Sequence, residues 1–185
     1  MIRAEELRDK ENLRKIAEKP GYYKWWAERR ELDVILRALQ VGCSDISSAL
    51  EGKDGLLCIY VGIAAKESVR ARLNWHVNDR HTESQVRNGT LSTLRQSIAS
   101  IVAHNQYDKS ATDAFIDRLY VEWFYSENAI KSEAAKSELH DIEQTLLAEH
   151  FRILNIQENR HPLSEKTKTA LKSLRKQSKN MNFLT

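Results

Sequence analysis

Six residues, spread in order along the chain, are of types that could do chemistry together. Two tyrosines each belong to a short glycine-containing motif, an arginine and a histidine are four positions apart, and a glutamate precedes an asparagine by twelve positions. A carboxylate can bind a hard divalent cation, an arginine can hold a phosphate, and a histidine can accept a proton from water near neutral pH. The set therefore predicts metal-assisted cleavage of a phosphodiester. Its members are Tyr23, Tyr60, Arg72, His76, Glu143 and Asn155.

Glu143 is expected on a mostly apolar side of a helix. Its neighbours three and four positions away include Leu139, Leu146 and Leu147. A carboxylate there would be partly desolvated, which is costly unless a proton, a cation or a metal compensates it. We therefore expect Glu143 to bind a divalent cation such as Mg²⁺, and a glutamate that reaches water at the rim is the alternative. His140 would make a two-residue metal pair with it, but the sequence indicates no third ligand.

Arg72 and His76 are expected on one helical face, because residues at i and i+4 point the same way. The arginine could hold a phosphate through several donors, and the histidine could act as a base. Tyr23 and Tyr60 are each expected in a strand that begins or ends at a glycine, where backbone can approach a substrate closely. Taken singly, these residues also fit an amphipathic helix with a satisfied histidine, and two aromatic core residues.

Basic residues gather in two stretches that could neutralise a nucleic-acid backbone, although the formal net charge is only +3. One stretch covers residues 63–95, and the other lies in the final helix, in residues 165–180. A serine and an arginine at a helix start could also bind a phosphate through backbone amides and a guanidinium. Ordinary capping explains that pair equally well, and a solvated helical face explains either basic stretch. The candidates for nucleic-acid contact are Lys66, Arg70, Ser92, Arg95, Lys172, Arg175 and Lys176.

Three short apolar or aromatic segments are predicted strands, at residues 22–26, 56–63 and 119–125. The second is almost continuously apolar, so we expect it in the centre of a sheet. Apolar spacing predicts helices between and after these strands. The mixed order predicts an α+β fold with a small central β-sheet of at least three strands, flanked by helices. The expected helices cover residues 4–18, 28–40, 66–78, 91–104, 111–118, 126–150 and 164–177.

Two connecting segments and one cap complete this prediction. Residues 80–90 are polar and expected to form a loop, and residues 44–50 are expected to form a short turn. Ser126 is the expected N-cap of the long helix that ends near residue 150.

The length of 185 residues fits one domain with a helical extension at either end. The two prolines of the chain mark the boundaries. We expect an N-terminal helical extension over residues 1–19, a central domain with inserted helices over 20–162, and a basic C-terminal helix and tail over 163–185.

The sequence indicates a cytoplasmic protein with no membrane partner. No apolar run approaches the roughly 20 residues that span a bilayer, and the N-terminal segment is charged, unlike a signal peptide. Cys43 and Cys58 lack the spacing of a zinc site, so we expect two reduced thiols.

Taken in order, the motifs resemble those of the GIY-YIG endonuclease superfamily. Gly21-Tyr22-Tyr23 resembles its first motif, Tyr60-Val61-Gly62 its second, and Arg72 with His76 its arginine helix. Glu143 and Asn155 resemble its metal-binding glutamate and terminal asparagine. The chain is more similar to the type II restriction enzymes of this superfamily than to its repair members. The features that it shares with them are the histidine, the long insertions and the free-standing chain.

Three departures accompany the resemblance. Tyr22 replaces the usual aliphatic centre of the first motif, and Ile63 stands where many members carry a lysine. The tyrosines at 23 and 60 are separated by 37 positions, far more than in compact members, so an insertion with a helix must be accommodated.

The resemblance implies hydrolysis of DNA with one Mg²⁺ or Mn²⁺ held by Glu143. It implies that Tyr23 or His76 is the general base, and the sequence leaves that choice open. Arg72 would hold the scissile phosphate, Tyr60 would orient it, and Asn155 would fix the site through hydrogen bonds.

The implied substrate is double-stranded DNA, and a restriction role would favour a homodimer. Roles in DNA repair or in a mobile element are alternatives within the superfamily, because a fold does not specify a substrate. A non-catalytic nucleic-acid-binding module and a protein-interaction domain are alternatives outside it.

Overall fold

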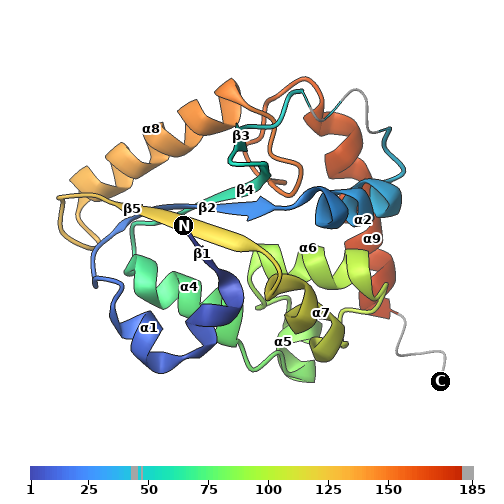
Figure 1. The fold of residues 1–185 in the computed structure, drawn as a ribbon, viewed down its shortest axis with the longest axis horizontal. Helices are drawn as coiled ribbons and strands as arrows, with labels where there is room; N and C mark the ends of the chain where they lie inside the picture. Colours follow the sequence, from blue (N-terminus) through green and yellow to red (C-terminus); the bar gives the residue numbers. More distant parts are fainter. Residues whose placement is uncertain (43–45, 47, 181–185) are drawn as a thin grey trace.

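The computed structural model of the chain describes residues 1–42, 46 and 48–180. Its centre is a five-stranded antiparallel sheet in the order β1-β5-β2-β4-β3 (Figure 1). The predicted α+β class with at least three strands is therefore confirmed. The strands are β1 (Ile2–Arg3), β2 (Gly21–Ala27), β3 (Gly52–Lys53), β4 (Leu56–Ala64) and β5 (Tyr120–Tyr125). The helices are η1 (Ala4–Arg8, a 3₁₀ helix), α1 (Lys10–Arg14), α2 (Arg29–Leu39), α4 (Val69–Asn78), α5 (Glu83–Asn88), α6 (Thr93–Val102), α7 (Lys109–Ile116), α8 (Glu133–Glu149) and α9 (Ser164–Asn180).

Strand β2 is the middle strand, between β4 and β5. Its aromatic side chains fill both sides of the sheet, and Trp25 and Trp26 have no exposed surface. The expectation of a central strand over residues 56–63 is confirmed in that β4 is an interior strand, with β2 on one side and the two-residue β3 on the other. That strand pairs with Leu56 and Leu57, at the beginning of β4. The later part of β4 therefore has a different partner, which belongs to the site described below.

Helices cover both faces of the sheet. Helix α8 lies across one face, and α4 and α6 lie beneath the opposite face (Figure 1). Leu73 of α4 and Leu94 of α6 belong to the same buried cluster as Trp25. Trp26 belongs to a smaller cluster, against which Leu146 of α8 packs. In the part of the chain that the structure describes, no helix is long and apolar enough to cross a membrane.

The single helix expected over residues 4–18 is wrong. Ile2 and Arg3 pair with β5 instead, and a 3₁₀ helix and a short α-helix follow. Asp9 separates the two helices, because its backbone is extended and its side chain accepts a hydrogen bond from the Glu11 amide. The segment packs on α4, where the Arg8 guanidinium donates to the Val77 carbonyl at 3.0 Å.

The loop expected over residues 80–90 contains the helix α5. Thr82 and Gln85 form a capping box at its start, each side chain hydrogen-bonding the other's backbone amide. Gly89 ends it with a left-handed φ of 67°. A polar composition hid this helix, since its only buried side chain is Val86.

Ser126 is not the cap of the long helix. Helix α8 begins at Glu133, and Ser132 caps it by accepting a hydrogen bond from the Ala135 amide. The Ser126 hydroxyl donates to the Glu138 carboxylate instead. The loop before α8 is therefore tied to the helix by its side chains.

Two expectations fall wholly or partly on residues outside the described ranges. The turn expected over 44–50 includes 44, 45 and 47, and Cys43 also lies outside. Cys58 is a buried free thiol, and burial raises its pKa to about 12. Such a thiol is unreactive at neutral pH.

Candidate active site

A buried hydrogen-bond chain joins β2, α4 and the residue before α6. The phenol oxygen of Tyr23 lies 2.8 Å from Nε2 of His76, and Nδ1 of His76 lies 2.9 Å from Oγ of Ser92. Tyr23 is 2% exposed and His76 is 1% exposed. Both ring nitrogens of the histidine are therefore engaged, one of them by the tyrosine of the first motif.

Burial controls the protonation of this chain. It lowers the pKa of His76 well below its usual value, and the positive charges of Arg72 and Arg95 lower it further. Burial also raises the pKa of Tyr23 well above its usual value and that of Tyr60 to about 12. At neutral pH the imidazole is therefore uncharged and both phenols carry their protons, so Nε2 of His76 can accept a hydrogen bond from the Tyr23 hydroxyl.

The glycines of the two tyrosine motifs are required by close approaches between strands. Gly62 lies opposite Tyr23, and a Cβ there would stand 2.4 Å from the phenol oxygen. A Cβ at Gly21 would stand 2.0 Å from the carbonyl oxygen of Phe124 in β5. The first glycine therefore lets β2 approach β5, and the second leaves room for the Tyr23 phenol.

Arg72 is held at the wall of the site by two neighbours. Its Nε lies 3.0 Å from a carboxylate oxygen of Glu67, and its guanidinium carbon lies 4.8 Å from the ring centre of Trp75. The helix starts after Ser68, whose hydroxyl accepts a hydrogen bond from the Ala71 amide at 3.1 Å. Sequence reasoning did not find Glu67 or Trp75. The i+3 spacing from arginine to tryptophan was the available signal.

Asn155 fastens the second motif. Its side-chain oxygen accepts from the Val61 amide at 2.9 Å, and its side-chain nitrogen donates to the Val61 carbonyl at 2.8 Å. The Leu154 amide donates to the Ile59 carbonyl at 3.0 Å beside it. This segment therefore takes the place of a neighbouring strand along the part of β4 that β3 does not reach. It fixes the backbone between Tyr60 and Gly62.

Glu143 of α8 lies beside Tyr60 and Asn155, where its carboxylate is partly desolvated. Burial and the negative charge of Glu158 raise its pKa to about 7, against smaller effects of His140 and Arg72. Within the described residues, no side chain donates a hydrogen bond to it. One ligand atom from each of Glu143, His140 and Glu158 lies within 4.8 Å of the others. Glu158 is thus the third potential metal ligand, which the sequence did not reveal. It lies in a loop that returns the chain to Glu143, and its own φ is 56°.

These side chains meet in one cavity of about 450 Å³. Tyr23, Tyr60, Arg72, His76 and Glu143 all line it. A smaller adjoining cavity is lined by Tyr60, Glu143 and Asn155. Five of the six predicted site residues therefore share one cavity, and the sixth supports its wall.

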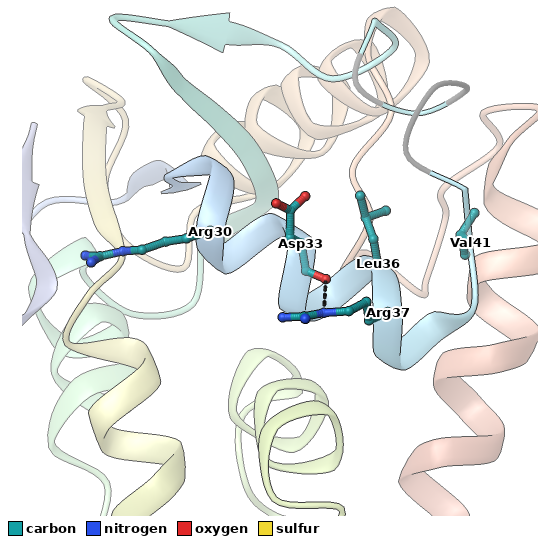
Figure 2. A pocket seen from close by; sticks show the side chains of 5 residues that line it. All are labelled: Arg30, Asp33, Leu36, Arg37 and Val41. Carbon is teal, nitrogen blue, oxygen red and sulfur yellow. Dashed lines mark hydrogen bonds between the residues drawn. The ribbon is translucent and has the colours of Figure 1, made fainter.

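A separate hollow lies beside α2 (Figure 2). The Arg37 Nε donates to the carbonyl of Asp33 within it, as Figure 2 shows, at 3.2 Å. None of the predicted site residues reaches this hollow, so we assign it no chemistry. Its lining residues are Arg30, Asp33, Leu36, Arg37 and Val41.

Arg95 was expected to contact a phosphate, and the structure gives it a different place. Its guanidinium has no exposed surface, donates to the His76 carbonyl at 2.8 Å and pairs with Asp113. Ser92 is also fully buried, and its hydroxyl contacts His76 and accepts from the Arg95 amide. Both residues hold the end of α4, so neither is available to nucleic acid. Burial, which the sequence does not display, is the reason.

Arg70 is likewise committed within the protein. Its guanidinium donates to the carbonyls of Ile16 and Arg14 and to the carboxylate of Glu18. It ties the N-terminal segment to α4 and is not set out for a phosphate.

The remaining basic candidates divide between the surface and the cavity. Lys66, Lys172 and Lys176 are exposed, as contact with a nucleic-acid backbone requires. Arg175 of α9 is only partly exposed and lines the cavity that contains Tyr60 and Arg72.

The fold and this site define a nuclease. The family model for the GIY-YIG catalytic domain matches residues 21–177. The chain therefore belongs to the GIY-YIG family, and its substrate is a nucleic acid. The match extends into α9. The sequence placed the end of the central domain earlier, at residue 162. Searches of curated proteins and of solved structures gave no match.

Proposed function

We propose that this protein is a divalent-metal-dependent DNA endonuclease that hydrolyses phosphodiester bonds. The observation that carries the proposal is the single cavity lined by two tyrosines, an arginine, a histidine and a carboxylate. These groups supply a proton acceptor, a phosphate ligand and a metal ligand within one site.

The donors fit a hard divalent cation. Glu143 has a pKa raised to about 7 and, among the described residues, no hydrogen-bond donor, so a bound cation would relieve its charge. Glu158 and His140 lie close enough to add ligands. A single Mg²⁺ or Mn²⁺ held by Glu143 would stabilise charge on the phosphate and on the leaving 3′ oxygen as a Lewis acid.

Tyr23 is our choice for the group that takes the proton from water. Both ring nitrogens of His76 are hydrogen-bonded within the protein, to Tyr23 and to Ser92. The imidazole can therefore receive a proton from a water in the cavity only by way of the Tyr23 oxygen. As the water oxygen bonds to phosphorus and the bond from phosphorus to the 3′ oxygen breaks, Tyr23 accepts the water proton. It passes its own proton to Nε2 of the uncharged His76. A proton from solvent completes the leaving hydroxyl.

The other residues bind and orient the phosphate. Arg72, braced by Glu67 and Trp75, donates to the non-bridging oxygens of the scissile phosphate. Tyr60 orients that phosphate from β4, and Asn155 keeps the Tyr60 backbone in place through Val61. The exposed Lys66, Lys172 and Lys176 contact the backbone of the duplex, which positions it without reading its sequence.

A plasmid assay tests the proposal. Supercoiled DNA incubated with Mg²⁺ or Mn²⁺ should be nicked or linearised, and DNA incubated with a chelator should stay intact. Binding of DNA without cleavage under every metal condition would support a non-catalytic nucleic-acid-binding module instead. Absence of any DNA binding at low salt would favour a protein-interaction domain.

The resemblance to type II restriction enzymes extends the proposal to sequence-specific cutting of double-stranded DNA in the cytoplasm by a homodimer. Digestion of a complex DNA should then give discrete fragments, and the protein should sediment as a dimer. Nicking or smearing would point to the repair or mobile-element roles.

A further inference from the structure

Arg175 is the one site residue that comes from the C-terminal helix α9. Helix α9 packs against α6, the helix that follows Ser92. From there the Arg175 side chain enters the cavity that Tyr60 and Arg72 also line. Its position differs from those of Lys172 and Lys176, which are exposed on the same helix.

The orientation of the Arg175 guanidinium is set by Gln96. The Gln96 side-chain nitrogen donates to the carbonyls of Gly89 and Leu91, at 3.2 and 2.6 Å. Its oxygen must therefore face the other way, and there it accepts a hydrogen bond from Arg175. One neutral acceptor occupies only part of the guanidinium, which carries five N–H donors.

Arg175 lacks the acidic partner that two fully buried arginines have. Arg95 pairs with Asp113 and Arg152 pairs with Glu51, and both arginines are fully buried. For Arg175, no carboxylate among the described residues lies within ion-pair distance. Burial lowers its pKa, and the one opposing influence is the Tyr60 phenol. A desolvated guanidinium with spare donors, facing a polar cavity, is suited to an anion that arrives with the substrate.

We propose that Arg175 binds a phosphate of the nucleic acid beside Tyr60, as a second phosphate-binding arginine in the cavity of Arg72. This inference rests on the proposed nuclease function and adds the C-terminal helix to the site. A phosphate is the anion that the site must receive, and the planar fork of an arginine contacts two of its oxygens at once.

The test uses Arg175→Met, which keeps the volume and removes the charge. In DNA binding without metal, the slope of log affinity against log salt should decrease by about 0.9, the value for one phosphate contact on duplex DNA. In single-turnover cleavage with Mg²⁺, the rate should decrease about 10²-fold, as for other lost charge-stabilising donors. The thermal unfolding midpoint should be equal to that of the wild type or higher, because the variant no longer buries a charge without an anion.

The matched control is Arg14→Ala, which removes one positive charge from a side chain that is 67% exposed and paired with Glu11. It should bind and cleave as the wild type does. A wild-type salt slope together with a wild-type cleavage rate in Arg175→Met would overturn the inference. A lower unfolding midpoint with unchanged binding would also overturn it, since it would show that Arg175 only braces Gln96.

The two proposals fail separately. If the wild-type protein binds DNA but cleaves none with any metal, the nuclease proposal fails, and the metal-free salt slope still decides the role of Arg175. If the wild type cleaves and Arg175→Met does so equally, only the inference about Arg175 fails.

Discussion

The Tyr23 phenol oxygen lies 2.8 Å from Nε2 of His76, in a buried contact between strand β2 and helix α4. This contact leads to a prediction for Tyr23→Phe, because the variant loses the oxygen that we propose exchanges protons with water. Its single-turnover rate of DNA cleavage should fall about 10²- to 10⁴-fold, the usual contribution of general base catalysis. DNA affinity should change little. The control is Tyr22→Phe, on the neighbouring and partly exposed tyrosine that stacks on Phe124. Equal rates for the two variants would remove Tyr23 from the proton path.

Gly62→Ala should damage the same contact from the opposite strand. The added Cβ would stand 2.4 Å from the Tyr23 oxygen, so the ring must shift from its position beside His76. We expect a loss of about 1–3 kcal/mol in the free energy of unfolding, as for other overpacked sites, and a loss of most cleavage activity. Chemical denaturation and single-turnover cleavage measure the two effects. Gly52→Ala is the control, because its nearest contact would be 3.9 Å away, and it should be neutral in both assays. Full activity in Gly62→Ala would show that the Tyr23 position is not critical.

The Asn155→Ala variant should be less stable than the wild type, because the amide and the carbonyl of Val61 lose their hydrogen bonds to the Asn155 side chain. A buried polar group that loses its partner costs about 1–3 kcal/mol. We expect a loss of at least about 2 kcal/mol in the free energy of unfolding, measured by urea denaturation. Asn74→Ala, at an exposed position on α4, should change it by less than about 0.5 kcal/mol. A neutral result at Asn155 would mean that the segment holds β4 through its backbone alone.

The types and order of the site residues could be predicted from the sequence, because they reflect local spacing. Arg72 and His76 share a helical face simply because they are four residues apart. The contact from His76 to Tyr23 could not be predicted, since it depends on how α4 packs against β2. Arg95 was assigned wrongly for the related reason that a basic side chain at a helix start looks the same whether it is exposed or buried. Glu158 was missed because a loop, and no periodic element, returns it to Glu143.

The elements were predicted where apolar periodicity marks them. The strands at residues 22–26, 56–63 and 119–125 follow from aromatic and β-branched composition, and they occur as expected. Helix α5 was missed because it buries so little, and the N-terminal helix was overextended because β1 pairs with a strand distant in the sequence. Pairing of that kind is invisible to local patterns.

The stability of the protein should depend on pH through Glu143. Its pKa is about 7 in the folded chain against an ordinary value of 4.5, so the folded state binds this proton more tightly. The contribution of Glu143 to stability is therefore complete below the ordinary value and is lost as the pH rises through about 7. Glu143→Gln should abolish this part of the dependence, as measured by thermal unfolding across the pH range. A Gln variant with an unchanged profile would assign the dependence to other groups.

A divalent cation should reverse that loss. Because Mg²⁺ or Mn²⁺ competes with the proton on Glu143, either ion should raise the unfolding midpoint more at about pH 8 than at about pH 6. The same titration with Glu143→Gln should show no metal effect at either pH. An equal shift in the variant would place the cation elsewhere.

The most direct test of metal-assisted cleavage is a single-turnover assay of Glu143→Gln, run with and without Mg²⁺ beside a measurement of DNA affinity. Glu149→Gln, an exposed position on the same helix, serves as the control. The wild type and the control should cleave DNA with Mg²⁺ and not with a chelator, whereas Glu143→Gln should bind DNA normally and cleave none under either condition. Cleavage by Glu143→Gln at the wild-type rate, or metal-independent cleavage by the wild type, would contradict the account.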